Sequence, residues 1–123
     1  MPSHEQKDAV VQAYIDAFAK GDPAAVAALF APGASVEDPV GTGAHVGHDA
    51  ILAFYTESMK TGAKLKLEGP VRTAGDYAAF AFSVSLAFKD TARIDVIDTF
   101  RFNEDGKVVE MHAYFGPNNM QGM

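Results

Sequence analysis

Residues 78–102 read AAFAFSVSLAFKDTARIDVIDTFRF, and large apolar side chains recur at every second position over most of this stretch. Such alternation is typical of β-strands that bury one face. The polar residues 89–91 divide the stretch, which predicts an antiparallel hairpin with a tight turn at these residues. Residues 64–67 alternate in the same way, and residues 107–115 complete a meander. The tail 116–123 has turn composition, so we expect it to lie loosely outside the sheet.

Helical spacing dominates the first half of the chain. Ser3 and Gln6 have the spacing of a capping box, which predicts a first helix over residues 3–20. A short second helix is expected from Asp22 to a stop at Pro32–Gly33, and a third over residues 49–62. Three helices followed by most of a sheet indicate the α+β class. Helices on the concave side of a curved, mainly antiparallel sheet would form a cone-shaped domain that encloses an apolar pocket.

The composition limits the kind of protein and its partners. The 123 residues are 48% hydrophobic and 21% charged, which suits a single domain over residues 1–123. The net charge of −6 disfavours binding to nucleic acid or to an anionic membrane. The chain has no cysteine, which excludes disulfides and thiolate chemistry. Acidic residues near the start and the lack of a long apolar run predict a cytoplasmic protein.

Two aspartates interrupt the apolar faces of the predicted strands. Asp98 stands in the row of Val96 and Phe100, and Asp38 shares its side of a short strand with Val36. Burial disfavours the charged form, so the pKa of Asp98 should rise and the neutral acid could donate a hydrogen bond. Asp38 ends its strand beside a glycine-containing loop, where solvent should keep it ionised as a base. Carboxyl groups in opposite protonation states are typical of a site that removes a proton and stabilises an oxyanion.

Simpler explanations exist for each of these residues. An inward aspartate can equally reflect a shift of strand register or a structural hydrogen bond. Tyr14 lies on the buried side of the first helix, where a tyrosine is more often packed in the core than catalytic. The four histidines, at positions 4, 45, 48 and 112, have no spacing that assembles a metal site, so we expect solvated or structural roles for them.

Several segments of the chain resemble a known family. They cover nearly the whole sequence and are VVQAYIDAFAKGD (10–22), VEDPVG (36–41), AILAFY (50–55), AAFAFSVS (78–85), VIDTFRFN (96–103) and GKVVEMHAYFG (106–116). These segments resemble the bacterial steroid Δ5-3-ketoisomerases, or ketosteroid isomerases, of the nuclear-transport-factor-2-like (NTF2-like) superfamily. The most specific part of the resemblance is VEDPVG together with VIDTFRFN at this separation.

The resemblance implies an active site and a reaction. Asp38 matches the general base of the family, Tyr14 the tyrosine of its oxyanion hole, and Asp98 its protonated aspartic acid. The family is itself the established example of a carboxylic acid kept neutral to donate a hydrogen bond. The implied reaction moves the double bond of a 3-oxo-Δ5 steroid to Δ4, by transferring a proton from C4 to C6 through a dienolate. It needs neither a metal nor an organic cofactor.

The resemblance also implies a pocket for a rigid apolar steroid and a homodimer joined through the outer face of the sheet. The residues expected to line the pocket are Phe54, Phe82, Val84, Met111 and Phe115. Tyr55, also expected at the substrate site, matches the family tyrosine that hydrogen-bonds the oxyanion-hole tyrosine. Phe30 stands where some relatives have a further tyrosine, and Phe115 where a tryptophan occurs, so the network and the outline of the pocket should differ.

Two other functions are compatible with the sequence. Related α+β domains also host polyketide cyclases, dehydratases and epoxide hydrolases, in which Asp38 would still be a base. The pair of Tyr14 and Asp98 separates these activities, because an isomerase that forms a dienolate needs paired donors in these places and a cyclase does not. A non-enzymatic module that binds an apolar ligand would leave the cost of inward aspartates unexplained.

Overall fold

The first helix, α1 (His4–Lys20), begins at the capping box that the sequence predicts. The computed structural model describes residues 1–123. In it the Oγ of Ser3 accepts the amide of Gln6 at 3.1 Å, and the Oε1 of Gln6 accepts the amide of Ser3 at 2.7 Å. Gly21 ends the helix at φ 65°, a left-handed conformation that glycine adopts without strain. The buried side of the capped helix packs on the sheet, where the ring of Tyr14 contacts those of Phe80 and Phe100.

The second helix is shorter than the sequence indicates. Helix α2 (Pro23–Ala27) ends before Phe30, which opens strand β1 (Phe30–Glu37). The expected stop at Pro32 and Gly33 is therefore wrong, because both residues lie inside β1. They fall in a stretch where the pairing of β1 with its parallel neighbour is irregular. Such a stretch tolerates proline because no ladder hydrogen bond is required of it there.

The third helix, α3 (His48–Met59), follows the short strand β2 (His45–Val46). It agrees with the helix expected over residues 49–62, except that the last three of these residues form a turn. Tyr55 lies on the buried side of α3. None of the helices is both long and apolar enough to cross a membrane.

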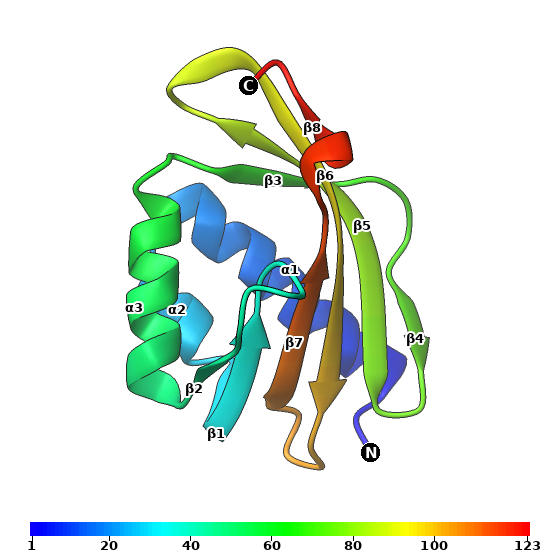
Figure 1. The fold of residues 1–123 in the computed structure, drawn as a ribbon. Coiled ribbons are helices and arrows are strands. Elements are labelled where there is room, and N and C mark those ends of the chain that lie inside the picture. Colours follow the sequence, from blue (N-terminus) through cyan, green and yellow to red (C-terminus); the bar gives the residue numbers. More distant parts are fainter.

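Eight strands form one curved sheet, and the helices lie on one face of it (Figure 1). The remaining elements are β3 (Lys64–Leu67), β4 (Arg72–Ala74), β5 (Tyr77–Leu86), β6 (Lys89–Phe102), β7 (Val108–Tyr114), the 3₁₀ helix η1 (Pro117–Asn119) and β8 (Met120–Gln121). The strand order is β2-β1-β7-β6-β5-β3, with β4 beside β5 and β8 beside β6. Only β1 and β7 run parallel. The arrangement confirms the predicted α+β class with a mainly antiparallel sheet.

The hairpin between β5 and β6 turns two residues earlier than the sequence indicates. Leu86 pairs with Lys89, so Ala87 and Phe88 form the turn, and residues 89–91 belong to β6. The expected position assumed an unbroken alternation, whereas the register shifts just before Leu86. Phe88 consequently leaves the buried face and is 66% exposed.

The tail belongs to the sheet, which corrects the expectation of a loose end. Helix η1 redirects the chain after β7, and β8 then pairs with β6, Met120 with Ile94 and Gln121 with Arg93. Strand β6 is longer than β7 and pairs with it only from Ile97 onward. Without β8, the preceding edge of β6 would lack a neighbour, and covering a free edge satisfies its backbone groups.

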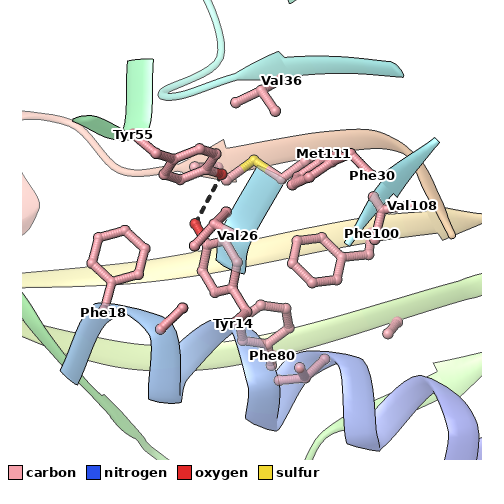
Figure 2. Close-up of a cluster of buried hydrophobic side chains, with 14 of the residues drawn as sticks. Tyr14, Phe18, Val26, Phe30, Val36, Tyr55, Phe80, Phe100, Val108 and Met111 are labelled. Atoms are coloured by element: carbon pink, nitrogen blue, oxygen red, sulfur yellow. Dashed lines mark hydrogen bonds between the residues drawn. The ribbon is translucent and has the colours of Figure 1, made fainter. Parts of the chain in front are cut away.

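The core lies between the helices and the inner face of the sheet. Tyr14 packs against Phe18 and Phe100 with ring centroids 5.3 Å apart in both pairs, and Figure 2 shows these rings meeting from α1 and the sheet. The buried aromatic residues of the core are Tyr14, Phe18, Phe30, Tyr55, Phe80, Phe82, Phe100 and Phe102. Buried aromatic rings contribute much of the stability of a small core. They therefore hold α1 and α3, and with them Tyr14 and Tyr55, in fixed positions over the sheet.

Candidate active site

One cavity brings together the three polar residues that the sequence singles out. It has a volume of about 310 Å³, and twelve of its sixteen lining residues are hydrophobic. Tyr14 comes from α1, Asp38 follows directly after β1, and Asp98 lies in β6. The other lining residues are Phe18, Ser58, Thr61, Ala63, Leu65, Phe82, Val84, Leu86, Phe88, Ile94, Val96, Phe115 and Met123.

Asp98 lies on the inner face of β6, where the alternation predicts it. Val96 in the same row is buried, whereas Ile97 on the outer face is half-exposed. Both carboxyl oxygens of Asp98 are buried and have no hydrogen-bond partner in the protein. Burial, followed by the charge of Asp38, raises the pKa of Asp98 well above its usual range, against an opposing effect of the Tyr14 hydroxyl. The neutral acid therefore faces the cavity with one O–H group to donate.

Asp38 is only partly buried, and its carboxyl group differs from that of Asp98. Burial raises the pKa of Asp38 to about 6. About nine-tenths of a group with this pKa is ionised at pH 7. A carboxylate whose pKa lies just below neutral pH is suited to accept and return a proton. The cavity thus holds one ionised and one neutral carboxyl group.

Hydrogen bonds hold the loop after β1 in place. The Oε2 of Glu37 accepts the amide of Gly41 at 2.7 Å. The amide of Val40 donates to the carbonyl of Ala113 at 2.8 Å. Ala113 in turn pairs with Asp98 across β7 and β6. The loop that carries the ionised carboxyl group is therefore tied to the strand beside the neutral one.

A pair of buried tyrosines lies beside the cavity. The hydroxyl groups of Tyr14 and Tyr55 share a hydrogen bond of 3.1 Å, drawn as the dashed line in Figure 2. Desolvation by burial raises the pKa of both phenols above the ordinary value, so both keep their protons. Phe30 packs against Tyr55 with ring centroids 6.2 Å apart and has no hydroxyl to continue the network. The network therefore ends at Tyr55.

Three of the six residues expected around a substrate line the cavity. They are Phe82, Val84 and Phe115. Tyr55 and Met111 do not line it, because both are fully buried in the core. Phe54 does not line it either, and its ring packs against that of His45 with centroids 4.7 Å apart. Alternation predicts the inner face on which Met111 lies, but it does not indicate how far along the strand a cavity extends.

Phe88 and Met123 line the cavity although the sequence does not suggest either. Phe88 borders the cavity from the hairpin turn, after Leu86 in β5, and β8 brings Met123. No local pattern marks Met123, because its position depends on the pairing of two distant segments. Ile94 and Val96 also line the cavity, and the alternation that identified Asp98 could have found them.

The four histidines lie outside the cavity, and no group of three or more histidine, aspartate and glutamate side chains is placed to hold a metal ion. His4 pairs with the hydroxyl of Thr73 at 2.8 Å. A ring nitrogen of His48 lies 2.7 Å from the carbonyl of Phe30. These contacts connect separate elements of the fold, so the two histidines have structural partners.

The cavity combines a carboxylate with two buried O–H groups inside apolar walls. A substrate carbonyl oxygen that accepted hydrogen bonds from both donors would tolerate growing negative charge. A carboxylate nearby could then remove a proton from the adjacent carbon. The apolar walls strengthen these electrostatic interactions because they exclude water. The arrangement suits proton transfer next to a carbonyl group.

The fold and this cavity define a class of protein. A family model described as a SnoaL-like domain matches residues 11–111. The solved structure of the epoxide hydrolase/cyclase-like enzyme SalBIII, with a role in pyran ring formation in the polyether salinomycin, superimposes with a TM-score of 0.90. The match covers 100% of both chains at 20% sequence identity, so it shows a shared fold. The chain is a SnoaL-like domain of the NTF2-like fold.

A relative with a higher sequence identity identifies the family within this class. The steroid Delta-isomerase of Nocardioides simplex is 42% identical over 120 residues, which cover 96% of this chain and 95% of the relative. The chain therefore belongs to the ketosteroid isomerase family and is an isomerase. This confirms the family that the sequence segments indicated.

Proposed function

We propose that this isomerase converts 3-oxo-Δ5 steroids into their conjugated Δ4 isomers. One observation carries the proposal: Asp98 is fully buried with neither oxygen hydrogen-bonded, and it lines the same cavity as Tyr14 and Asp38. A buried polar group without a partner costs stability. A substrate oxygen in the cavity would supply the missing acceptor. The similarity to a steroid Delta-isomerase supports a steroid as the substrate.

Tyr14 and Asp98 act in this proposal as the oxyanion hole. The 3-oxo oxygen of the steroid accepts one hydrogen bond from the phenol and one from the neutral carboxylic acid. Their hydrogen bonds strengthen as negative charge develops on that oxygen. Because packing already holds both groups in position, little reorganisation accompanies the reaction. The raised pKa values of Tyr14 and Asp98 support this role, since both groups must keep their protons.

Asp38 acts as the general base for both proton transfers. It takes the proton from C4, the electron pair of that C–H bond forms a C3–C4 double bond, and the carbonyl electrons move to the oxygen. The resulting dienolate then takes the proton back from Asp38 at C6. The carbonyl re-forms and the remaining double bond lies between C4 and C5. The product is an isomer of the substrate and Asp38 returns the proton that it takes, so the proposed reaction consumes no cofactor.

A direct assay tests the proposal. Purified protein mixed with 5-androstene-3,17-dione should produce the ultraviolet absorption band of a conjugated enone. Asp38→Asn should lower turnover by about 10³-fold or more while steroid binding persists, because the amide keeps the shape of the side chain but does not take the proton. An enone band that grows no faster than in the absence of protein would remove the proposed function. Loss of folding or of steroid binding in the variant would give Asp38 a structural role instead.

We also propose that two copies associate through the outer face of the sheet. Val40, Ile97 and Tyr114 are partly exposed there around a hollow of about 720 Å³. Arg93 and Asp95 form an ion pair at the border of this hollow. Exposed apolar side chains rimmed by polar ones are typical of a protein interface. Light scattering should give twice the mass of the chain, and the mass of one chain at micromolar concentration would contradict the homodimer.

A further inference from the structure

The inner face of the β5–β6 hairpin forms a continuous floor from Asp98 to the open end of the cavity. Its successive pairs are Phe80 with Asp98, Phe82 with Val96 and Val84 with Ile94. Strands rise about 3.3 Å per residue, which places Ile94 about 13 Å along β6 from Asp98. Both strands continue to the hairpin turn, which lies near the end of the tail in Figure 1. The cavity thus has its carboxyl groups at one end, and at the far end it reaches the hairpin turn, where Thr61 also lines it and accepts the amide of Ala87 at 3.1 Å.

Two exposed apolar side chains border this far end. Phe88 and Met123 both line the cavity, yet they are 66% and 54% exposed. Neither belongs to the core or packs against it. Side chains that face both the cavity and solvent lie at its opening, so we call Phe88 and Met123 the apolar lip. Large apolar groups in water are unfavourable, and an apolar ligand that covered the lip would gain affinity.

Backbone contacts hold the tail half of the apolar lip in place. Strand β8 pairs with β6 at Ile94, the last inner residue of the cavity floor. The Oγ1 of Thr91 donates to the carbonyl of Gly122 at 3.2 Å. Gly122 lies at φ 68°, and a Cβ at this position would overlap the carbonyl of Thr91. Only glycine allows this close approach, which holds Met123 beside the opening.

We propose that the apolar lip binds a hydrocarbon substituent at the far end of the substrate, which on a 3-oxo steroid is the side chain at C17. The inference rests on the proposed function, because the hydrogen bond from Asp98 to the 3-oxo group sets how far the rings reach. A fused four-ring skeleton is comparable in length with the distance from Asp98 to Ile94. The rings therefore fill the cavity and the substituent reaches the lip. The enzyme favours 3-oxo-Δ5 steroids with an apolar C17 side chain over those without one.

A matched pair of substrates tests the apolar lip. Androst-5-en-3-one and pregn-5-en-3-one differ only by an ethyl group at C17. We expect the ratio of their kcat/KM values to favour the ethyl compound about tenfold in the wild type, from the burial of two carbon atoms. Phe88→Ala and Met123→Ala should each lower this ratio, and the double variant should bring it near one. Phe88→Leu, which keeps an apolar side chain, should retain most of it.

Tyr77→Ala is the control for these variants. Tyr77 is a largely exposed aromatic residue at the opposite end of β5, outside the cavity, and its loss should leave the ratio at the wild-type value. Inhibition constants of the two Δ4 products give the same ratio without turnover, so a reaction limited by encounter cannot hide the effect. Circular dichroism checks that every variant is folded.

The outcomes separate the apolar lip from the proposed function. A wild-type ratio near one in both measurements, or a ratio that the double variant leaves unchanged, overturns the inference. If both substrates give enones but both ratios are near one, only the lip is overturned and the isomerase proposal stays intact. If neither substrate gives an enone, the proposed function fails. A preference that falls with each truncation supports the lip.

Discussion

Asp95 and Asp98 lie three residues apart on β6 and have opposite environments. Asp95 is on the outer face, where its carboxylate accepts hydrogen bonds from Arg93 at 2.8 Å and from Gln121 at 3.3 Å. Asp98 is on the inner face, where neither oxygen has a partner and burial raises the pKa. One residue type is thus an ion-pair partner at one position and a neutral acid at the other. The difference shows that the face of a strand decides the chemistry of a carboxyl group.

Of Asp95 and Asp98, the inner residue, Asp98, should have the larger effect when it is replaced. We expect Asp98→Ala to lower kcat for 5-androstene-3,17-dione about 10²- to 10³-fold, because one oxyanion donor is lost. Asp98→Asn should retain more activity, since its amide can still donate a hydrogen bond. Steady-state kinetics on both variants shows which of them retains more activity. An Asn variant less active than the Ala variant would argue against a donor at this position.

The pH dependence sharpens the contrast between the two protonation states. Asp38, with a pKa of about 6, must be ionised to take a proton. The value of kcat/KM should therefore fall about tenfold per pH unit below pH 6, since it reports the free enzyme. Asp98 acts in its protonated form, which burial favours and a lower pH does not remove, so it adds no loss of rate on the acid side. Rates measured from pH 4 to 8 check this, and a flat profile through pH 6 would exclude Asp38 as the base.

A conservative change beside Tyr14, in the proposed oxyanion hole, should have a smaller effect. Tyr55→Phe removes the hydroxyl that bonds Tyr14 and keeps the buried ring. We expect kcat to fall about three- to tenfold, the size of one net hydrogen bond, with little change in KM. Tyr77→Phe removes an exposed hydroxyl outside the cavity and serves as the control. Equal kinetics in the two variants would mean that the Tyr14–Tyr55 bond does not support the reaction.

Replacing the outer aspartate should have the smallest effect of all. Asp95→Asn breaks an exposed ion pair, so activity should stay within about twofold of the wild type. The free energy of unfolding, measured with urea, should change by less than about 1 kcal/mol, because exposed ion pairs contribute little. A loss of activity comparable with that of Asp98→Asn would contradict the claim that the face of β6 decides the role of each aspartate.

Successive side chains of a strand alternate between its two faces, and this alternation depends only on neighbouring residues. The sequence alone therefore predicts that Asp98 lies on the inner face. The capping box at Ser3 and the end of α1 at Gly21 are local in the same sense. The predicted position of the hairpin turn is wrong because the pairing of Leu86 with Lys89 depends on contacts between two strands. The prediction of a loose tail is wrong for a similar reason, because β8 pairs with an edge of β6 that the shorter β7 leaves free.

The alternation of a strand predicts which face a residue lies on, but it does not predict how deeply that residue is buried within the domain. Met111 lies on the inner face, as the alternation predicts, but it pairs with Phe100 on the core side of Asp98. Helices cover that end of the sheet, so Met111 packs in the core instead of lining the cavity. Phe82, on the other side of Asp98 along the hairpin, lines the cavity. The two differ in how the helices lie across the sheet, which depends on the whole fold.

The hydrogen bond from Val40 to Ala113 makes β7 a shared support for both acids. Because β1 runs parallel to β7, the loop with Asp38 leaves the sheet at the level where Ala113 pairs with Asp98. A single strand, β7, therefore contacts both the loop that carries Asp38 and the strand that carries Asp98. Tyr14 comes from α1, and its ring packs against Phe80, the residue that pairs with Asp98 in the sheet. The sheet around Asp98 therefore positions the phenol as well as the two acids, and a substitution in β7 should disturb more of the site than one at the exposed surface of the helices.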